Sequence, residues 1–379
     1  MVATTALLER GFGEVKRLCY AGLDAPTLLR AVATRMGRVA PFDAYCAQTN
    51  DPISGLLTQV LTTDVFGEKE HRHYLEQIYF QEDRDEQRRM VRNRSPVVRL
   101  SDVTAGRLDR ATRYRELTGP LGLGYETLAI CAVGRQQWGG INFIRERGRP
   151  DFDMREVALL RRLAPHVASG LQAAALRTLA TTAPEAESAP GVLMLDDCGR
   201  VGHYTQAAEH YLRELDDVGP DWLEGRGLPA SVWIAVGGLR RALTPETDRD
   251  LRLAPRICAQ TRAGRWLTLH GARTLADGGR QGETVIIIEP SQPRELAWLR
   301  ASAYGLSARE RVVVDRVAQG ASTKAIAAAL CISEYTLQEH LSHIFDKVGV
   351  RGRQALVQRL FFDQLAPQIL TVSEHGASQ

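Results

Sequence analysis

The spacing of apolar residues divides the chain into three regions. In residues 1–178 and 191–290, short β-prone runs alternate with stretches in which apolar residues recur every three or four positions, the period of a helix. In residues 300–365 only the helical period appears. Residues 179–190 lack any apolar period and predict a linker, and residues 366–379 predict a flexible tail. The pattern indicates a multidomain chain with two α+β domains followed by an all-α domain of four helices.

The first region begins with two predicted amphipathic helices, at residues 7–18 and 25–39. Apolar runs between turn residues then predict strands at residues 42–48, 56–61, 97–100, 125–133 and 138–144. Gly134 is the predicted turn of the last hairpin, and Gly139 with Gly140 is a predicted β-bulge. The order favours helices outside a central antiparallel sheet.

Two further helices of the first region differ in character. Charges of both signs alternate along residues 82–94, which predicts a solvated helix. A long apolar-periodic stretch starts near Asp153 and continues past Leu176, with Pro165 as a predicted kink. This long helix is a candidate for dimerisation, and packing on its own sheet is the equal alternative.

The second region repeats the pattern of short strands and turns. Its β-prone runs predict strands at residues 192–195, 201–204, 256–261, 265–275 and 283–289. A short helix is predicted at residues 206–215. Two strands, small helices and a three-stranded meander therefore follow one another. Asp196 and Asp197 fit a turn between the first two strands.

Cap and stop signals bound the helices of the third region. Ser307, followed three residues later by Glu310, is a capping box that starts the first helix, and Gly320 offers a left-handed end. Ser322 caps a second short helix. Residues 331–333 form a turn too short for the third helix to lie antiparallel, so the third helix is predicted to cross the second.

The third helix has one apolar stripe and one polar face. Its apolar residues recur at helical spacing until Gly349, and they are Leu337, Leu341, Ile344 and Val348. The residues left facing outward are Glu334, Tyr335, Gln338, Glu339, Ser342, His343 and Asp346. A fourth helix at residues 353–363 closes the bundle. This arrangement predicts a helix-turn-helix whose third helix is sized for the major groove of DNA.

The motifs of the third region carry a family resemblance. LSxRE, GxSxKxIAxxL, ISxxTL and HLxxIxxKVGV stand in register from Leu306 onward, and the segment resembles the LuxR/GerE-type DNA-binding domain. The alternatives are a small helical bundle without a nucleic-acid role, or a protein-interaction scaffold that keeps the fold without DNA affinity. The resemblance favours DNA.

The resemblance implies a DNA-contacting surface. Thr323, Lys324 and Thr336 match positions that hold the DNA backbone or support the helix that does, and hydroxyls and cations suit phosphate. The residues expected to form the DNA-binding surface are Thr323, Lys324, Tyr335, Thr336, Gln338, Glu339, Ser342, His343, Lys347, Arg351 and Arg353.

The chain departs from the family in charge. Gln338 stands where the family usually has lysine, and Glu334, Glu339 and Asp346 make the third helix locally acidic. Residues 300–363 contain nine Arg and Lys against six Asp and Glu, a balance of +3. We expect weak binding by one copy and dependence on a homodimer. Because glutamine can bond an adenine edge through two hydrogen bonds, we hypothesise that Gln338 reads sequence.

The two upstream regions resemble sensor domains. The first resembles a GAF-type domain, as found in actinobacterial regulators, and the second resembles a PAS-like fold. An open GAF-type pocket would be lined by Phe42, Tyr45, Tyr125, Cys131, Trp138 and Phe143. Aromatic residues at strand spacing more often form core, so packing is the alternative. The resemblance implies a small-molecule effector.

Composition bounds the remaining classes. The 379 residues are 44% hydrophobic and 25% charged, as in soluble globular proteins. No apolar run approaches a membrane span and the N-terminus carries charge too early for a signal peptide, so we expect a cytoplasmic protein without a membrane partner. The six cysteines contain no CxxC pair and the histidines no metal-binding spacing, so no metal or other cofactor is expected. The net charge of +3 is too small to indicate nucleic-acid binding by itself.

The leading hypothesis is therefore a transcription regulator that is not an enzyme. Its expected partners are double-stranded DNA, a small-molecule effector, a second copy of the chain and RNA polymerase. A phosphoacceptor receiver domain is disfavoured because the second region contains no lysine, and no acyl-homoserine-lactone motif is found. An enzyme with a DNA-targeting tail is the alternative from another class, although no GxSxG, phosphate loop or metal-ligand cluster supports it.

Overall fold

The computed structural model describes residues 5–63, 65–181, 189–215, 227–243, 256–275 and 281–362. The chain forms two compact units, residues 1–174 with 188–290 and residues 175–187 with 291–379. The predicted tail and residues 182–188 of the predicted linker lie outside the described residues. In the part that is described, no helix is both long and apolar enough to cross a membrane.

The first sheet of the larger unit has five antiparallel strands in the order β2-β1-β5-β4-β3. They are β1 (Ala44–Asn50), β2 (Leu57–Thr62), β3 (Val97–Arg99), β4 (Leu123–Val133) and β5 (Gln136–Glu146). All five predicted strands of the first region are confirmed. Gly134, with φ of +62°, turns the β4–β5 hairpin. The register skips Trp138, so the bulge precedes the two glycines at which it was predicted.

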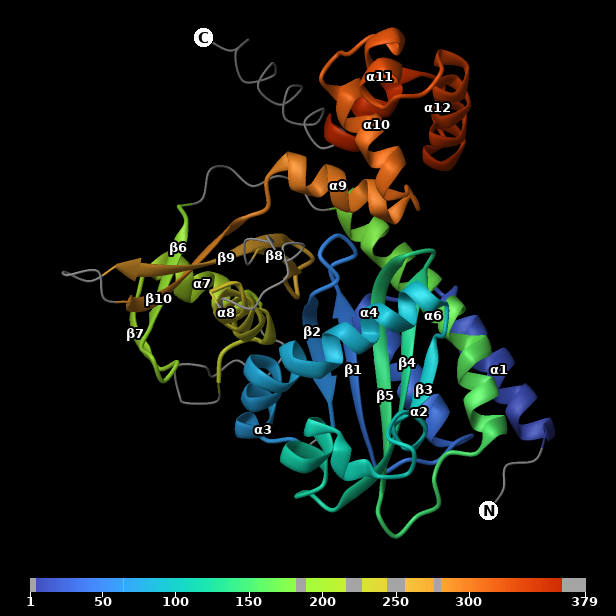
Figure 1. Ribbon diagram of the computed structural model, residues 1–379, viewed down its shortest axis with the longest axis vertical. Helices are drawn as coiled ribbons and strands as arrows, with labels where there is room; N and C mark the ends of the chain where they lie inside the picture. Colours follow the sequence, from blue (N-terminus) through green and yellow to red (C-terminus); the bar gives the residue numbers. More distant parts are fainter. Residues whose placement is uncertain are drawn as a thin grey trace, which may run out of the picture. The chain divides into compact units, whose positions relative to one another are not determined.

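Helices lie on both faces of this sheet (Figure 1). Those in front of the strands are α3 (Glu68–His73), the π-helix η1 (Tyr74–Asp83) and α4 (Arg84–Asn93). Those behind are α1 (Thr5–Cys19), α2 (Ala25–Gly37) and α6 (Met154–Thr181). The short helices between β3 and β4 are α5 (Leu100–Val103), η2 (Leu108–Arg110) and η3 (Tyr114–Thr118). The two amphipathic helices and the long helix are thus found as predicted.

A glycine allows α6 to approach β5. A Cβ atom at Gly139 would lie 2.5 Å from the carbonyl oxygen of Gln48 and 2.7 Å from Cδ1 of Leu171 in α6. Any larger residue would push the helix away from the sheet. The helix continues through Pro165 over 28 residues.

The prediction of a solvated helix at residues 82–94 is wrong. Asp83, Arg84 and Gln87 are buried although they are polar, and Met90 belongs to a small apolar cluster with β4. Buried charges occur where partners from other elements pair with them. Alternating charge in the sequence does not show such partners, so it could not distinguish this helix from an exposed one.

The second sheet of the larger unit has the order β7-β6-β10-β9-β8. Its strands are β6 (Gly191–Leu195), β7 (Val201–Tyr204), β8 (Arg256–Gln260), β9 (Trp266–Leu275) and β10 (Gln281–Pro290). All five predicted strands are confirmed, as is the short helix α7 (Gln206–Glu214). If the strands of each region are numbered 1 to 5 along the chain, both sheets have the same strand order, 2-1-5-4-3.

The two sheets share a hydrophobic core. Residues of β2 and η1 pack with residues of the second sheet and with α8 (Ala230–Ala242). Nine residues of α8 are buried, so the helix is apolar on all sides and no amphipathic period marked its bounds in the sequence. A Cβ atom at Gly237 would lie 2.7 Å from the ring of Phe80, which explains the glycine where α8 meets η1.

The smaller unit is a helical bundle. Its helices are α9 (Pro293–Ala303), α10 (Ala308–Ala318), α11 (Thr323–Ala329), α12 (Glu334–Val348), α13 (Arg353–Val357) and the π-helical turn η6 (Gln358–Phe362). The four predicted helices are confirmed, with the fourth divided into α13 and η6. The Ser307 capping box is present, because its hydroxyl accepts the N–H of Glu310 and the Glu310 carboxylate accepts the N–H of Ser307 at 2.7 Å.

Helix α9 was not predicted, although the sequence carries its start signal. The Glu295 carboxylate accepts the backbone N–H of Gln292 at 2.9 Å, and Pro293 occupies the first helical position. Trp298 of this helix packs on the bundle core, with its ring 6.1 Å from that of Phe361. The bundle therefore begins earlier than residue 300.

Candidate nucleic-acid interface and ligand cavity

A short turn sets the crossing of α11 and α12. Cys331 has a left-handed φ of +53°, and the backbone N–H of Ile332 donates to the carbonyl of Ala327 at 3.0 Å. Ser333 caps α12, because its hydroxyl accepts the backbone N–H of Thr336 at 3.0 Å. The small side chain of Ala327 is buried, so α11 and α12 contact each other closely.

Helix α12 has the predicted buried stripe and exposed face. The stripe is at most 4% exposed and consists of Leu337, Leu341, Ile344 and Val348. The exposed residues are Glu334, Tyr335, Gln338, Glu339, Ser342, His343, Asp346 and Lys347. Tyr335 is 73% exposed, which is unusual for so large a ring. Lys324 in the first turn of α11 and Arg351 after α12 are exposed as well.

Three of the residues expected to contact DNA also bind within the fold. Lys347 Nζ lies 2.8 Å from both carboxylate oxygens of Glu310. Arg353 donates to the carbonyl of Ala321 at 2.9 Å and to the hydroxyl of Thr323 at 2.8 Å. These bonds tie α12 to α10, and the start of α13 to the start of α11. Lys347, Arg353 and Thr323 therefore position the helices.

The ion pair of α10 and α12 is stable at neutral pH. Burial alone would raise the pKa of the Glu310 carboxyl, but hydrogen bonds from Lys347 and Ser307 outweigh it and lower the pKa. The carboxylate stays charged, so Lys347 keeps its partner. The capping box was predicted from the sequence. The ion pair was not predicted, because Lys347 lies far from Glu310 in the sequence, in helix α12.

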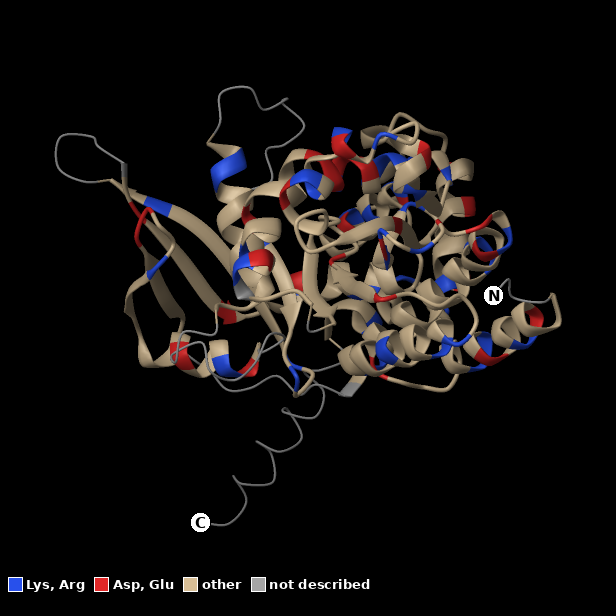
Figure 2. Cartoon of the chain, turned by 90° about the horizontal axis from the view of Figure 1, so that it is seen from below, with Lys and Arg blue, Asp and Glu red and all other residues tan. Residues whose placement is uncertain are grey.

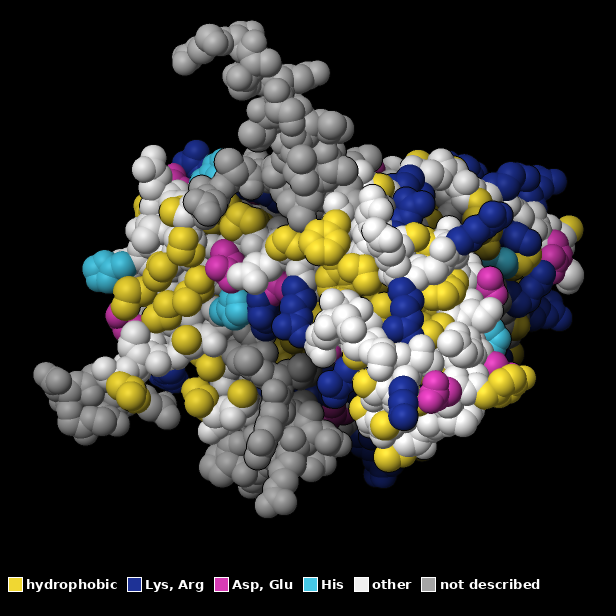
Figure 3. All heavy atoms as spheres, turned by 90° about the horizontal axis from the view of Figure 1, so that it is seen from above, with side chains coloured by type: hydrophobic (Ala, Val, Ile, Leu, Met, Phe, Trp, Pro, Cys, Tyr) yellow, Lys and Arg dark blue, Asp and Glu magenta, His cyan; other side chains and the backbone are white. Residues whose placement is uncertain are grey.

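Charged residues of both signs occur on the parts of the chain that Figures 2 and 3 show. In Figure 2, blue and red segments adjoin each other on the helices, whereas most strand residues are tan. On the face in Figure 3, dark blue side chains stand mostly among apolar and uncharged ones, with magenta acids between them. Because the formal net charge of the chain is only +3, the indication of DNA binding depends on the shape and residues of α12.

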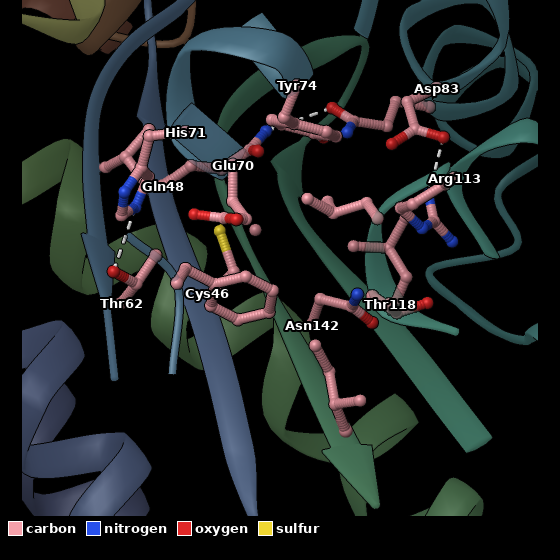
Figure 4. Close-up of a pocket in the computed structure, with 17 residues that line it drawn as sticks. Cys46, Gln48, Thr62, Glu70, His71, Tyr74, Asp83, Arg113, Thr118 and Asn142 are labelled. Carbon is pink, nitrogen blue, oxygen red and sulfur yellow. Dashed lines mark hydrogen bonds and ion pairs between the residues drawn. The ribbon is translucent and has the colours of Figure 1, made fainter. Parts of the chain in front are cut away.

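A cavity of about 40 Å³ lies between the first sheet and the helices α3, η1 and η3 (Figure 4). Its apolar walls are Val60, Phe66, Leu117, Leu128 and Ile144. Its polar residues are Cys46, Gln48, Thr62, Glu70, His71, Tyr74, Asp83, Gln87, Arg113, Thr118 and Asn142. The volume admits a group the size of a few water molecules.

A buried ion network forms one wall of the cavity. Arg113 donates to Asp83 at 2.5 Å and to Glu126 at 2.8 Å. Glu126 also accepts the hydroxyl of Thr118 at 2.7 Å and the side-chain amide of Asn142 at 2.8 Å. Burial alone would lower the pKa of the Arg113 guanidinium, but the two carboxylates raise it well above its ordinary value. Arg113 is therefore a fixed cation.

Four side-chain amides form a second network beside α4. Gln48 donates to Asn50 at 3.1 Å and to Gln87 at 3.0 Å. Gln137 donates to the same two oxygens, at 3.2 Å and 2.9 Å. All four residues are buried. The amides hold α4 on β1 and β5, and this polar face of the sheet was not predicted.

Two reactive side chains of the cavity are neutral. Burial raises the pKa of the Cys46 thiol to about 12, so it is no nucleophile at neutral pH. Burial also lowers the pKa of His71. Its Nδ1 lies 3.1 Å from the carbonyl of Gly67 and its Nε2 lies 2.9 Å from the hydroxyl of Thr62. Because a carbonyl only accepts, Nδ1 carries the proton and Nε2 accepts from Thr62.

None of the six residues predicted to line a pocket lines this cavity. The β1–β5 register pairs Tyr45 with Phe143 and Cys46 with Asn142, so the two pairs point to opposite faces of the sheet. Cys46 and Asn142 line the cavity. Phe143 lies on the other face, where its ring centroid is 4.9 Å from that of Phe42.

The same alternation places the remaining three residues. In β4, Tyr125 and Cys131 stand next in sequence to residues that face the cavity, so their side chains lie on the other face of the sheet. Trp138 is buried at the bulge in β5. Polar residues inside strands mark the cavity face better than aromatic ones do. Those signals are Gln48, Glu126 and Asn142.

Residues 304–360 match the family described as bacterial regulatory proteins, luxR family. The spore germination protein GerE of Bacillus subtilis (strain 168) is 44% identical over 61 residues, which are 16% of this chain and 82% of GerE. The HTH-type transcriptional regulator GfsR of Streptomyces halstedii is 33% identical over 95 residues, 24% of this chain and 39% of GfsR. The transcriptional regulatory protein NarL of Mycobacterium tuberculosis (strain ATCC 25618 / H37Rv) is 46% identical over 52 residues, 14% of this chain and 24% of NarL. The chain thus spans well under half of GfsR and NarL.

Two solved structures resemble larger parts of the chain. The VqsR LBD domain from Pseudomonas aeruginosa has a TM-score of 0.31 and 16% identity, and covers 44% of this chain and 94% of that one. The phage VqmA-DPO complex has a TM-score of 0.24 and 18% identity, over 45% of this chain and 79% of that one. TM-scores this low do not identify the fold of the upstream regions.

Proposed function

The chain belongs to the LuxR family of bacterial regulatory proteins, and from this premise we propose that it is a sequence-specific DNA-binding regulator of transcription controlled by a small molecule. The observation that carries the proposal is α12, which presents a polar, exposed face on a fully buried apolar stripe. A helix held in this way across a preceding short helix fits the major groove.

The exposed residues divide by the part of DNA that suits them. Lys324 and Arg351 are exposed cations and bind phosphate. Gln338 and His343 face base edges on α12. The other residues on the same surface are Tyr335, Glu339 and Ser342, and those that support it from within the fold are Thr323, Thr336, Lys347 and Arg353.

The proposed regulator acts as a homodimer in the cytoplasm. The acidic residues of α12 weaken the attraction of a single copy to phosphate, and two copies on symmetric half-sites compensate for this weakness. Helix α6 is the candidate dimer contact. RNA polymerase is the expected further partner, and the GAF-like and PAS-like nature of the two upstream regions remains part of the proposal.

The π-helix η1 provides a route from the cavity to the second sheet. Tyr74 and Asp83 of η1 line the cavity, while Tyr79 and Phe80 of the same helix lie in the core shared with α8. A ligand that moves η1 therefore changes packing in both sheets. It shifts the equilibrium of the regulator only if it binds the two arrangements with different affinity. Helices of the π type are rare and often occur at functional sites.

The DNA-binding part is tested by affinity as a function of salt. The 379-residue protein and duplex fragments selected from genomic DNA should form a complex that weakens steeply as salt rises. Lys324→Ala and Arg351→Ala should each weaken binding and lower the logarithmic salt slope by about 1. Arg10→Ala removes an exposed cation of α1 and serves as the matched control. Salt-independent binding, or no binding at low salt, would contradict the proposal.

The role of Gln338 is tested separately. Gln338→Ala should relax base preference at one position of the site and cost about 1–3 kcal/mol on the preferred sequence. If affinity and base preference both stay unchanged, Gln338 does not read sequence. Gln319→Ala, which removes an exposed glutamine of the same helical unit outside the proposed surface, is the matched control.

A protein-interaction scaffold is the second candidate function. The observation that favours it is the acidic character of the exposed face, where Glu334, Glu339 and Asp346 stand beside the exposed ring of Tyr335. The salt titration separates the two functions, because a scaffold would give no DNA complex even at low salt.

A further inference from the structure

Two buried acceptors face the cavity. Asp83 Oδ2 and Asn142 Oδ1 are shielded from solvent, and neither has a hydrogen-bond donor with good geometry among the described residues. Asp83 is 2% exposed, and both residues line the cavity (Figure 4). A buried acceptor without a donor costs free energy, so a donor is expected in the cavity, either from ordered water or from a ligand that displaces it.

The orientation of Asn142 is fixed by its neighbour. Its Nδ2 group donates to the Glu126 carboxylate at 2.8 Å, and a carboxylate only accepts. Rotating the amide would place two acceptors against each other. The Asn142 carbonyl oxygen is therefore the group left to receive a donor.

The orientation of Asp83 is fixed in the same way. Its Oδ1 atom accepts the Arg113 guanidinium at 2.5 Å, and Arg113 is held in turn by Glu126. The Tyr74 hydroxyl interacts with the same carboxylate, because burial, the charge of Asp83 and a side-chain hydrogen bond with Asp83 raise the pKa of the phenol well above its ordinary value. Asp83 Oδ2 remains the second acceptor.

The local charge disfavours an anionic ligand. Glu70 and Asp83 line the cavity and Glu126 binds directly to its wall, while Arg113 is the one permanent cation in this group. Three acids against one base leave a formal charge of −2. His71 does not alter this balance at neutral pH, because burial keeps it uncharged. An anion would meet net repulsion, and a donor or cation would meet attraction.

We propose that the cavity receives the nitrogen end of a small ligand whose N–H groups donate to Asp83 Oδ2 and Asn142 Oδ1 and whose carbon skeleton contacts Val60, Leu128 and Ile144. The inference rests on the proposed sensor role of the first region and specifies the chemistry of the effector. The small volume, about 40 Å³, limits the enclosed part of the ligand to a few atoms. A protonated amine meets both the hydrogen-bonding and the charge requirement, and a neutral amide meets only the first.

The test compares three probes with the same carbon skeleton, namely propylammonium, propionamide and propionate. Binding to the 379-residue protein in the absence of DNA is measured by ligand-observed NMR titration. We expect propylammonium to bind best, propionamide more weakly and propionate not measurably. Because DNA is absent, this result is independent of the salt titration, so failure of the ligand chemistry and failure of DNA binding are distinguishable.

Matched variants locate the site. Asp83→Asn should weaken propylammonium binding about tenfold or more, because a charge-assisted hydrogen bond is lost. Asp102→Asn is the control, since Asp102 is also an aspartate bound to an arginine, Arg99, and does not line the cavity. Asn142→Leu removes the second acceptor and covers the case in which Asp83→Asn does not fold. The proposal is overturned if none of the probes binds, if propionate binds as well as propylammonium, or if the folded variants bind as the unaltered protein does.

Discussion

The cores of the helical unit and of the first sheet differ in what they bury. The helical unit encloses an almost entirely apolar cluster, in which Leu337, Leu341 and Leu356 are nearly inaccessible to solvent. One face of the first sheet instead encloses Arg113 with two carboxylates and four amides. An apolar core stabilises a rigid surface for presenting α12, whereas a polar core carries desolvation cost and offers hydrogen-bonding groups to a ligand. Under the proposed function, the helical unit presents a surface to DNA, and the first sheet holds the groups that respond to a small molecule.

Removal of Arg113 should have the largest effect on this comparison. Arg113→Ala leaves Asp83 and Glu126 buried without a cation, which costs about 3–5 kcal/mol of folding free energy. Urea unfolding with hydrogen exchange should show the loss in peptides of β4, η1 and η3, and little change in peptides of α12. Arg89→Ala is the control, because Arg89 is an exposed arginine of α4. Equal stability of the two variants would show that the polar network is not a structural core.

Truncation in the apolar core should have the next largest effect. Leu341→Ala removes a side chain that is 2% exposed and should cost about 2–5 kcal/mol through lost burial and a cavity. Hydrogen exchange should now increase in α10 to α13 and remain unchanged in the first sheet. Ser342→Ala changes the adjacent exposed residue of the same helix and should shift stability by less than about 0.5 kcal/mol.

The two regions also differ in how far the sequence predicted them. The helices of the bundle follow from local signals, such as the Ser307 capping box and the left-handed Gly349, which lie within a few residues of the elements they bound. The polar network depends on Arg113 meeting Asp83, its partner 30 positions away, and no local pattern predicts that meeting. Helix α9 was not predicted although its start signal, Pro293 at the first helical position, lies in the sequence.

The strands of both sheets were predicted, but their apolar pattern did not show which face of the first sheet lines the cavity. Residues of β5 are buried on both faces, so the period of two that distinguishes inside from outside is absent. The sequence therefore could not distinguish aromatic residues such as Phe143 from the residues that line the cavity. The cavity became visible only when the register placed Asn142 and Cys46 beside each other.

Loss of a helix cap should give a smaller effect than either core change. Ser333→Ala removes the acceptor for the N–H of Thr336 and should cost about 1 kcal/mol in the helical unit. Ser333→Asp retains a capping acceptor and should restore most of that stability. If thermal unfolding of the two variants is the same, the cap does not hold the start of α12.

The pH dependence of the first sheet should be the smallest effect. Burial lowers the pKa of His71 below its ordinary 6.5, so the unfolded chain binds the proton more readily than the folded one. This contribution is complete above the unfolded-state pKa and is lost as the pH falls through the lower folded-state value. Between about pH 7.5 and about pH 5.5, His71→Gln should lose less stability than the unaltered protein does. A larger pH-dependent loss in the variant would contradict this assignment.

Site-specific crosslinking tests the central claim, that the exposed face of α12 contacts DNA, most directly. A photoreactive amino acid in place of Ser342 should crosslink to duplex DNA on illumination at low salt. The same residue in place of Val312, a 45% exposed position of α10 outside the proposed interface, should crosslink much less. The account predicts a strong, salt-sensitive crosslink from position 342. A complex with DNA that gives no crosslink from position 342, or equal crosslinks from both positions, would contradict it.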